Sequence, residues 1–203
     1  LFTYSPMNSE HQVFFASLSL KKKIKNILEI GTFDGTNSYQ LSILFPKAKI
    51  TTFDLPANSE EFKKSYDRSE FIKRNQFLKK RNMILKKSKN IKFFEKNSLH
   101  LIFKKKKYDL IWVDGAHANP VVTSDIINSL RLLSKNGIMA CDDIYTQKST
   151  EDISSENFDP KFADKMFSNL NAYETLLSLK AANLIKFKLI YKRIDMNNVI
   201  PSR

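Results

Sequence analysis

The sequence contains a single cysteine, and none of its apolar runs approaches the ~20 residues that a membrane-spanning helix needs. One cysteine, Cys141, excludes an internal disulfide and suits a reducing compartment, so we expect a cytoplasmic protein without a membrane partner. Cys141 lies in the apolar run GIMAC, which indicates a buried thiol rather than a nucleophile. The first residues lack the basic and apolar regions of a signal peptide, and the chain begins with Leu1, as a trimmed chain or a piece of a longer protein would.

Arginine is scarce as well. The 203 residues carry a formal net charge of +13, but lysine supplies 28 of the 34 basic residues. Arginine is the better bidentate ligand for phosphates and for guanine, whereas a composition rich in Lys, Asn, Ile and Phe follows from AT-rich codons. The lysine clusters at 21–23 and 104–107 each precede an expected strand, as solvated loop ends do. We therefore do not expect a nucleic-acid partner.

The remaining composition fits one globular domain over residues 1–203. The length suffices for one full core, and no repeat or low-complexity linker divides the chain. Strand-like and helix-like patterns alternate along it. This alternation predicts an α/β protein with a single Rossmann-like, doubly wound sheet, mostly parallel, with helices on both faces.

Short apolar runs mark the expected strands, and longer amphipathic stretches mark the helices. The expected strands are 26–30, 49–54, 91–95, 108–114, 138–142 and 184–194, followed by an antiparallel last strand at 197–201. The expected helices are a leading helix at 9–22 and further helices at 36–45, 121–133 and 161–182, with residues 136–137 ending the third. The charged segment 59–88 predicts one or two helices, which serve either as a plain cover of the sheet or as a lid or inserted segment.

The most informative stretch reads NILEIGTFDGTNSYQLSILFPKAKITTFDLP, residues 26–56. It predicts a strand, a tight turn bracketed by Gly31 and Gly35, a helix, and a second strand that ends at Asp54. A glycine turn lets a ligand approach the backbone, and an acid after the second strand can accept hydrogen bonds from ribose hydroxyls. The stretch therefore predicts half of a nucleoside-binding site.

The spacing of the glycines indicates which nucleoside-containing cofactor the site would bind. A dinucleotide site prefers G-x-G-x-x-G, but this turn has Glu29, Gly31 and Gly35 as E-x-G-x-x-x-G, without the middle glycine. Phe33 and Asp34 stand where a pyrophosphate needs access, and Asp34 would repel it. S-adenosylmethionine carries an ammonium and a sulfonium, so its charges suit these acids better. A nicotinamide-dependent oxidoreductase remains as an alternative.

Acids also end the other expected strands. Besides Glu29 and Asp54, Asp114 ends the fourth strand, and Asp142 and Asp143 follow the fifth. In a parallel sheet these ends share one edge, where unpaired carboxylates repel one another and a bound cation relieves the repulsion. We therefore expect a cationic cofactor, a divalent metal, or both at this edge.

Two stretches, LEIGTFDGTNS and VDGAHANPVVTSDIINSLRLLSKNGIMACDDI, resemble class I S-adenosylmethionine-dependent methyltransferases. They are most similar to small metal-dependent O-methyltransferases of the catechol type and the macrocin type, and the resemblance spans about residues 7–143. It implies methyl transfer to a hydroxyl of a sugar, a phenol or another small polyol, and family habit suggests a homodimer. The implied cofactor contacts are Glu29, Gly31, Thr32, Phe33, Gly35, Asp54, Leu55, Asn97, Ser98 and Asp114.

The same resemblance implies a hard cation, Mg²⁺ or a similar one, on Asp114, Asp142 and Asp143. Catechol-type enzymes carry a lysine three residues after the first of these acids, and this chain has His117 there. Histidine can act as the catalytic base beside Asp114, because its unperturbed pKa of ~6.5 lies near neutral pH. The other interpretation is that His117 only caps the next helix. His11 is a second candidate base, and Asn97 stands where the family often has an acid.

One further alternative is a non-catalytic, RNA-associated module that has lost methyl transfer. Intact acids at each expected strand end argue against it, because a degenerate site would have lost some of them. DNA-base methylation is also disfavoured, because DGAH stands where that group carries a D/N-P-P-Y/F motif.

Overall fold

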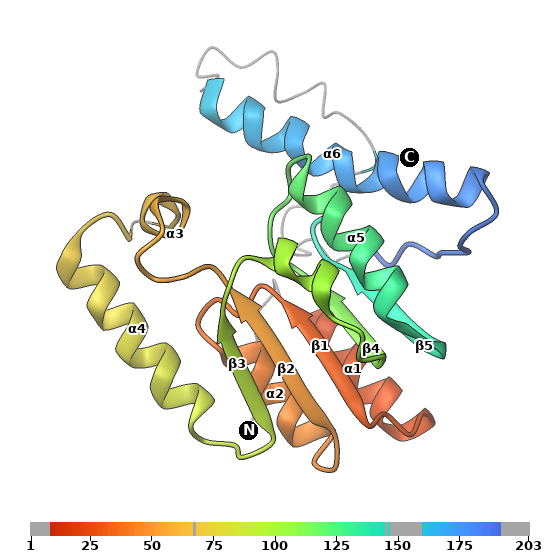
Figure 1. The fold of residues 1–203 in the computed structure, drawn as a ribbon, viewed down its shortest axis with the longest axis horizontal. Helices are drawn as coiled ribbons and strands as arrows, with labels where there is room; N and C mark the ends of the chain where they lie inside the picture. The colour runs from red at the N-terminus through yellow and green to blue at the C-terminus, as the bar shows by residue number, and fades with distance from the viewer. Residues whose placement is uncertain (1–8, 67, 145, 147–159, 192–203) are drawn as a thin grey trace, which may run out of the picture.

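The structure is a computed structural model that describes residues 9–66, 68–144, 146 and 160–191 (Figure 1). Five parallel strands form one sheet in the order β3-β2-β1-β4-β5. The strands are β1 Asn26–Ile30, β2 Lys49–Asp54, β3 Ile91–Glu95, β4 Tyr108–Val113 and β5 Leu133–Cys141. The chain runs outward from β1 to β3 and then returns to the other side of β1 for β4. The carboxyl ends of β1 and β4 therefore flank the switch point where such sheets bind ligands.

Helices cover both faces of this sheet (Figure 1). They are α1 Ser9–Lys21, α2 Thr36–Leu44, α3 Glu60–Lys64, α4 Phe71–Leu85, the 3₁₀ helix η1 Ser98–Phe103, α5 Val121–Leu132 and α6 Pro160–Ala181. The helices α1 and α2 pack on one face, η1 and α5 pack on the other, and α6 packs against α5. No helix in the described part of the chain is both long and apolar enough to cross a membrane.

The central strands are apolar almost throughout because both of their faces are buried. Ile27 packs with Phe15 and Leu41 on the α1 and α2 face. The next residue, Leu28, packs with Leu101 and other side chains on the η1 and α5 face. Successive side chains of a strand point to opposite faces, so a strand covered on both sides reads as a continuous apolar run. This explains why β1 and β4 could be predicted from their continuous apolar runs.

The predicted fold class is confirmed: the sheet is Rossmann-like, with helices on both faces. The bounds of β1, β2 and β3 agree with the expected strands, and the leading helix ends at Lys21. Segment 59–88 holds two helices, α3 and α4. The described sheet is wholly parallel, and the expected antiparallel strand at 197–201 lies outside the described residues.

Two predictions about the second half of the chain were wrong, and one helix was not predicted at all. Residues 184–191, the described part of the expected strand 184–194, are not a strand, because Ile185 and Phe187 pack against the α5–α6 cluster instead of extending the sheet. The strand β5 begins at Leu133, which pairs with Tyr108 before an irregularity in the ladder, so residues 136–137 lie within β5 and do not end α5. The helix η1, which joins β3 to the start of β4, had no expected counterpart.

Candidate active site

The turn after β1 begins with Gly31, where there is no room for a side chain. Gly31 has φ +96°, and a Cβ there would lie 1.9 Å from the carbonyl oxygen of Asp114. The amides of Gly31 and Thr32 both donate to the Phe53 carbonyl, at 2.9 and 3.2 Å. The hydroxyl of Thr32 lies 2.6 Å from that of Thr52. The turn is thereby fixed against the ends of both β2 and β4.

A different neighbour, Leu85, limits the space at Gly35. It has φ +83°, and a Cβ there would lie 3.0 Å from the side chain of Leu85 at the end of α4. It also precedes the first residue of α2. The backbone conformation and the packing of α4 therefore explain this glycine without any ligand.

Asp54 lies at the end of β2 and faces the turn. Its Oδ2 accepts from the amide of Phe33 at 2.8 Å, and its Oδ1 accepts from the amide of Leu55 at 2.8 Å. Burial raises the pKa of this carboxyl, while the backbone donors and the charges of Arg81 and Arg68 act in the opposite direction. A carboxylate has about four acceptor sites, so two remain for the hydroxyls of a ribose.

Glu29 lies deeper than expected. Its side chain is fully buried, and it accepts from Asn37 Nδ2 at 2.8 Å, from Thr52 Oγ1 at 2.5 Å and from the Ser38 hydroxyl. Burial raises its pKa to about 7 against the effect of these donors. Glu29 therefore ties β1 to β2 and to the first turn of α2. Its direct contact with a cofactor stays a prediction.

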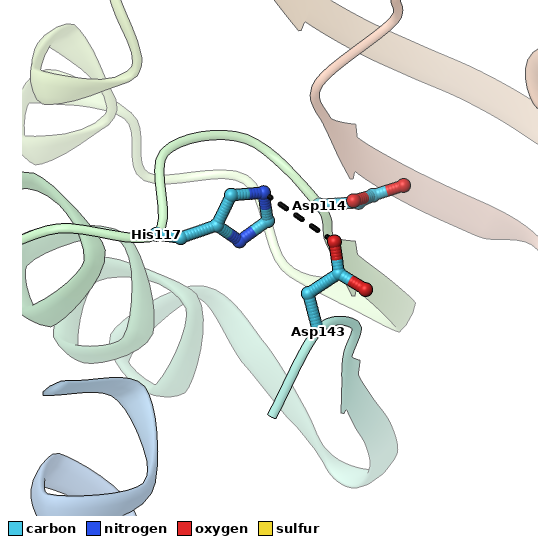
Figure 2. A group of neighbouring side chains, drawn as sticks. All are labelled: Asp114, His117 and Asp143. Atoms are coloured by element: carbon cyan, nitrogen blue, oxygen red, sulfur yellow. Dashed lines mark ion pairs between the residues drawn. The ribbon is translucent and has the colours of Figure 1, made fainter. Parts of the chain in front are cut away.

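The acids of β4 and β5 meet beside this turn (Figure 2). One ligand atom from each of Asp114, His117 and Asp143 can be chosen so that all three lie within 4.8 Å of one another. His117 Nε2 lies 3.7 Å from Asp143 Oδ2. Burial raises the pKa of Asp114 to about 8, and repulsion from Asp142, Asp143 and Glu29 adds to the rise. A divalent cation would relieve this repulsion.

Asp142 is placed differently from the other two acids of the expected metal set. Its Oδ2 lies 3.1 Å from His11 Nε2, and its Oδ1 accepts from the amide of Asp143 at 2.8 Å. The His11 ring contacts the edge of Trp112, with centroids 4.8 Å apart. In this arrangement Asp142 anchors α1 to the end of β5, and the group that gathers around Asp114 contains His117 in its place.

Asn97 and Ser98 follow β3, where adenine contacts were expected. Asn97 Oδ1 accepts from the amide of Leu99 at 2.9 Å and so caps η1. Its carbonyl oxygen is therefore already engaged within the chain. The Ser98 hydroxyl faces α5, where it lowers the pKa of Asp125.

Two buried arginines near Asp54 escaped the sequence reasoning. Arg81, in α4, has no exposed surface and binds Glu95 Oε1 at 2.5 Å. The guanidinium of Arg68 lies 3.9 Å from the ring centre of Phe62 and 4.9 Å from that of Phe77. The residue type alone could have pointed to them. Arginine is rare in this lysine-rich chain, and it is the better partner for buried carboxylates and aromatic rings.

Backbone strain also concentrates at this edge of the sheet. Among the described residues, the non-glycine residues with positive φ are Phe33, Tyr66, Asp143 and Asn183. The first three surround the site: Phe33 contacts the ring of Tyr66 at 5.1 Å, and Asp143 belongs to the acid group. Bulky residues in this conformation are costly and cluster at functional sites.

Comparison with known proteins places this edge in context. A family model described as a methyltransferase domain matches residues 28–144, which contain the turn, Asp54 and all the acids above. No curated protein matches the chain. The solved structures that match share its fold at low sequence identity.

Three of these structures illustrate the degree of similarity. A candidate caffeoyl-CoA O-methyltransferase from Staphylococcus aureus is 19% identical, with a TM-score of 0.62, over 89% of this chain and 77% of that one. The methyltransferase PaMTH1 from Podospora anserina, bound to S-adenosylhomocysteine, is 20% identical, with a TM-score of 0.58, over 86% and 68%. The N-methyltransferase NodS from Bradyrhizobium japonicum is 17% identical, with a TM-score of 0.55, over 88% and 83%.

These likenesses establish the fold of S-adenosylmethionine-dependent methyltransferases, and they favour neither the oxidoreductase nor the RNA-associated alternative. The family model extends over more than half of the chain and covers the whole candidate site. The chain belongs to the methyltransferase-domain family.

Proposed function

We propose that this methyltransferase transfers the methyl group of S-adenosylmethionine to a hydroxyl of a small acceptor such as a sugar, a phenol or another polyol. The observation that carries the proposal is the grouping of Asp114, His117 and Asp143 at the ends of β4 and β5. This group adjoins the glycine turn, since Gly31 touches the backbone of Asp114. A cofactor held by the turn and an acceptor held by the group would therefore lie side by side.

The cofactor half of the site would bind through Asp54 and the turn. The two free acceptor positions of Asp54 suit the 2′- and 3′-hydroxyls of the ribose, because Phe33 and Leu55 already hold its carboxylate in place. Glu29 would act through the turn by fixing β1, β2 and α2 together. Holding both reactants in line would supply most of the rate enhancement.

The oxygen-rich group fits a hard divalent cation. Asp114 and Asp143 would hold Mg²⁺ or a similar ion, and Asp142 would join them if it released His11. Burial and the neighbouring acids raise the pKa of Asp114 to about 8, and a cation bound at this carboxylate would offset both effects. A bound cation would lower the pKa of an acceptor hydroxyl.

His117 would be the catalytic base. The imidazole of His117 would take the hydroxyl proton as the oxygen bonds to the methyl carbon and the carbon–sulfur bond breaks, releasing S-adenosylhomocysteine. Asp143, 3.7 Å away, would stabilise the imidazolium that forms. The fold alone does not choose the acceptor atom, because it is shared with an N-methyltransferase. A base beside an acid group favours oxygen, since a neutral amine needs less help to attack.

Calorimetric titration of EDTA-treated protein with S-adenosylhomocysteine, and separately with NADH, tests the cofactor. Micromolar binding of S-adenosylhomocysteine would support the proposal and justify a screen of sugars and phenols in the presence of Mg²⁺. Binding of NADH alone would overturn it in favour of the oxidoreductase.

Once an acceptor is found, His117→Ala tests the base. We expect the chemical step to slow at least about 100-fold, which is the lower end of the usual contribution of a general base. The affinity for S-adenosylhomocysteine should be unchanged. His100→Ala is the matched control, because His100 lies in η1 and outside the acid group. An unaltered rate in His117→Ala would leave this histidine with a structural role.

A further inference from the structure

His11, in the first turn of α1, is a nearly buried histidine with no role in the proposed mechanism. Its Nε2 lies 3.1 Å from Asp142 Oδ2, and the side chains of His11 and Asp142 are only 15% and 10% exposed. The His11 ring also contacts the edge of the Trp112 ring, with centroids 4.8 Å apart. Trp112 is buried in β4, so this contact helps to fix the position of the His11 ring.

The contact between His11 and Asp142 is close but poorly directed. His11 Nε2 makes no hydrogen bond to any residue that the structure describes, although it lies within ion-pair distance of the Asp142 carboxylate. A pair held by charge alone is weaker than one with a directed hydrogen bond, so a stronger partner can displace it. A divalent cation carries twice the charge of an imidazolium and is such a partner for a carboxylate.

Asp142 lies close to the group around Asp114. Its amide donates to the Val113 carbonyl at 3.0 Å, and its Oδ1 accepts from the Asp143 amide at 2.8 Å. Burial contributes most to the raised pKa of Asp114, and among the neighbouring acids Asp142 contributes most. The carboxylate that His11 holds is therefore adjacent to the candidate cation site, without belonging to its group of three.

The proposed base cannot also bind the cation through the nitrogen that takes the proton. In the described part of the chain, the groups placed to share a cation are Asp114, Asp143 and His117. A histidine nitrogen that binds a cation has no lone pair left for a proton. For His117 to act as the base, another ligand has to take its place, and Asp142 is the neighbouring carboxylate. A bound cation would then have to draw Asp142 away from His11.

We propose that His11 is a positioning residue that competes with the cation for Asp142. Without a cation, His11 holds this carboxylate against α1. When the cation binds, Asp142 leaves His11 and joins Asp114 and Asp143, and His117 stays free for the acceptor. The inference rests on the proposed cation site and links that site to α1. His11 lowers the affinity for the cation, because its pair with Asp142 must break before this carboxylate can bind.

Calorimetric titration of the cofactor-free protein with Mg²⁺ tests the competition. His11→Phe keeps an aromatic ring against Trp112 and removes the nitrogen that holds Asp142. It should bind Mg²⁺ at least about fivefold more tightly, which corresponds to about 1 kcal/mol. In an Asp142→Asn background the same replacement should change the affinity by less than about twofold, because the carboxylate that His11 holds is absent. His100→Phe is the matched control and should leave the affinity unchanged, because His100 lies in η1 and outside the acid group.

His11→Leu, with a smaller apolar side chain, serves in the same titration if His11→Phe does not fold. An unchanged or weaker Mg²⁺ affinity in the His11 variant would overturn the inference, as would a gain of the same size in the Asp142→Asn background. Absence of Mg²⁺ binding to the unmodified protein would overturn it together with the proposed cation. Binding of S-adenosylhomocysteine is measured without Mg²⁺, so it decides the methyltransferase proposal separately.

Discussion

The two halves of the site differ in what surrounds their acidic side chains. At the ends of β1 and β2, which form the cofactor half, Glu29 accepts from three side chains and Asp54 accepts from two backbone amides. At the ends of β4 and β5, which form the acceptor half, burial raises the pKa of Asp114 and the acids around it raise it further. The cofactor half is satisfied by its own chain, whereas the acceptor half is held together against repulsion.

This difference indicates how each half would bind. The donors around Glu29 and Asp54 fix the turn before any ligand arrives, so the cofactor would meet a preorganised surface. The acceptor half has acids, a histidine and a strained Asp143 with φ 50°. Charge of the opposite sign would stabilise it, so its geometry should depend on a bound cation. The two halves should therefore respond differently to mutation, metal and pH.

The largest effect is expected from Gly31→Ala, because this residue joins the two halves. The added Cβ would lie 1.9 Å from a backbone oxygen of Asp114, and φ +96° is unfavourable for alanine. We expect the free energy of unfolding to fall by more than about 4 kcal/mol in urea titrations, or the protein not to fold.

Gly115→Ala is the control for this variant. Its added Cβ would lie 3.1 Å from the Cγ2 methyl group of Ile30, and the nearest backbone atom of Ile30 would be 3.8 Å away. It should cost no more than about 1.5 kcal/mol. Similar losses in both variants would show that the turn does not couple the halves as described.

The next effect separates the halves by ligand. Asp54→Ala should weaken S-adenosylhomocysteine binding about 100-fold, or about 2.7 kcal/mol, because two ribose hydroxyls lose their acceptor. Asp143→Ala should leave that affinity within about threefold and lower the affinity for Mn²⁺ or Mg²⁺ at least about tenfold. Calorimetry with each ligand measures both. If each variant lost both ligands equally, the division into halves would be wrong.

The sequence predicted the backbone of the cofactor half well, for a local reason. A buried strand, a tight turn, a helix and a second strand are encoded within 31 consecutive residues, 26–56, and both amides that donate to the Asp54 carboxylate lie inside that stretch. The parallel pairing of β1 with β2, two strands joined by the short helix α2, brings Gly31, Phe33 and Asp54 together. Both strands in this stretch have the predicted bounds, and the helix ends one residue earlier than predicted, at Leu44.

The acceptor half was predicted less completely, because its side chains depend on distant partners. The sequence identified Asp114, Asp142 and Asp143, but not that α1 would bring His11 to Asp142. Outside this half, the sequence did not reveal that Asn97 would cap η1, or that Asp125 would be buried near Gly115. Such choices follow from packing between elements far apart in the chain, which residue spacing does not encode.

The smallest effect, a dependence of stability on pH, measures the cost of ionising Asp114, which is buried and lies among other acids. In EDTA, the folded state holds a proton on Asp114 up to about pH 8, whereas the unfolded chain releases it near pH ~4. The unfolded state therefore binds fewer protons between these values, and stability falls as pH rises. Asp114→Asn removes this term, so the variant should gain about 1–3 kcal/mol over the unmodified protein at pH 8 and nothing at pH 4.

Asp34→Asn provides a control of opposite sign. The amide and side chain of Thr36, together with Lys80, lower the pKa of Asp34 against the effect of burial, so its contribution is present above pH ~4 and is lost as pH falls. This variant should be slightly less stable than the unmodified protein at pH 8. A gain in Asp114→Asn accompanied by loss of metal binding would show that the acceptor half sacrifices stability for function, as active sites commonly do. No gain would mean that Asp114 already has a stabilising partner, and the contrast between the two halves would then have to be abandoned.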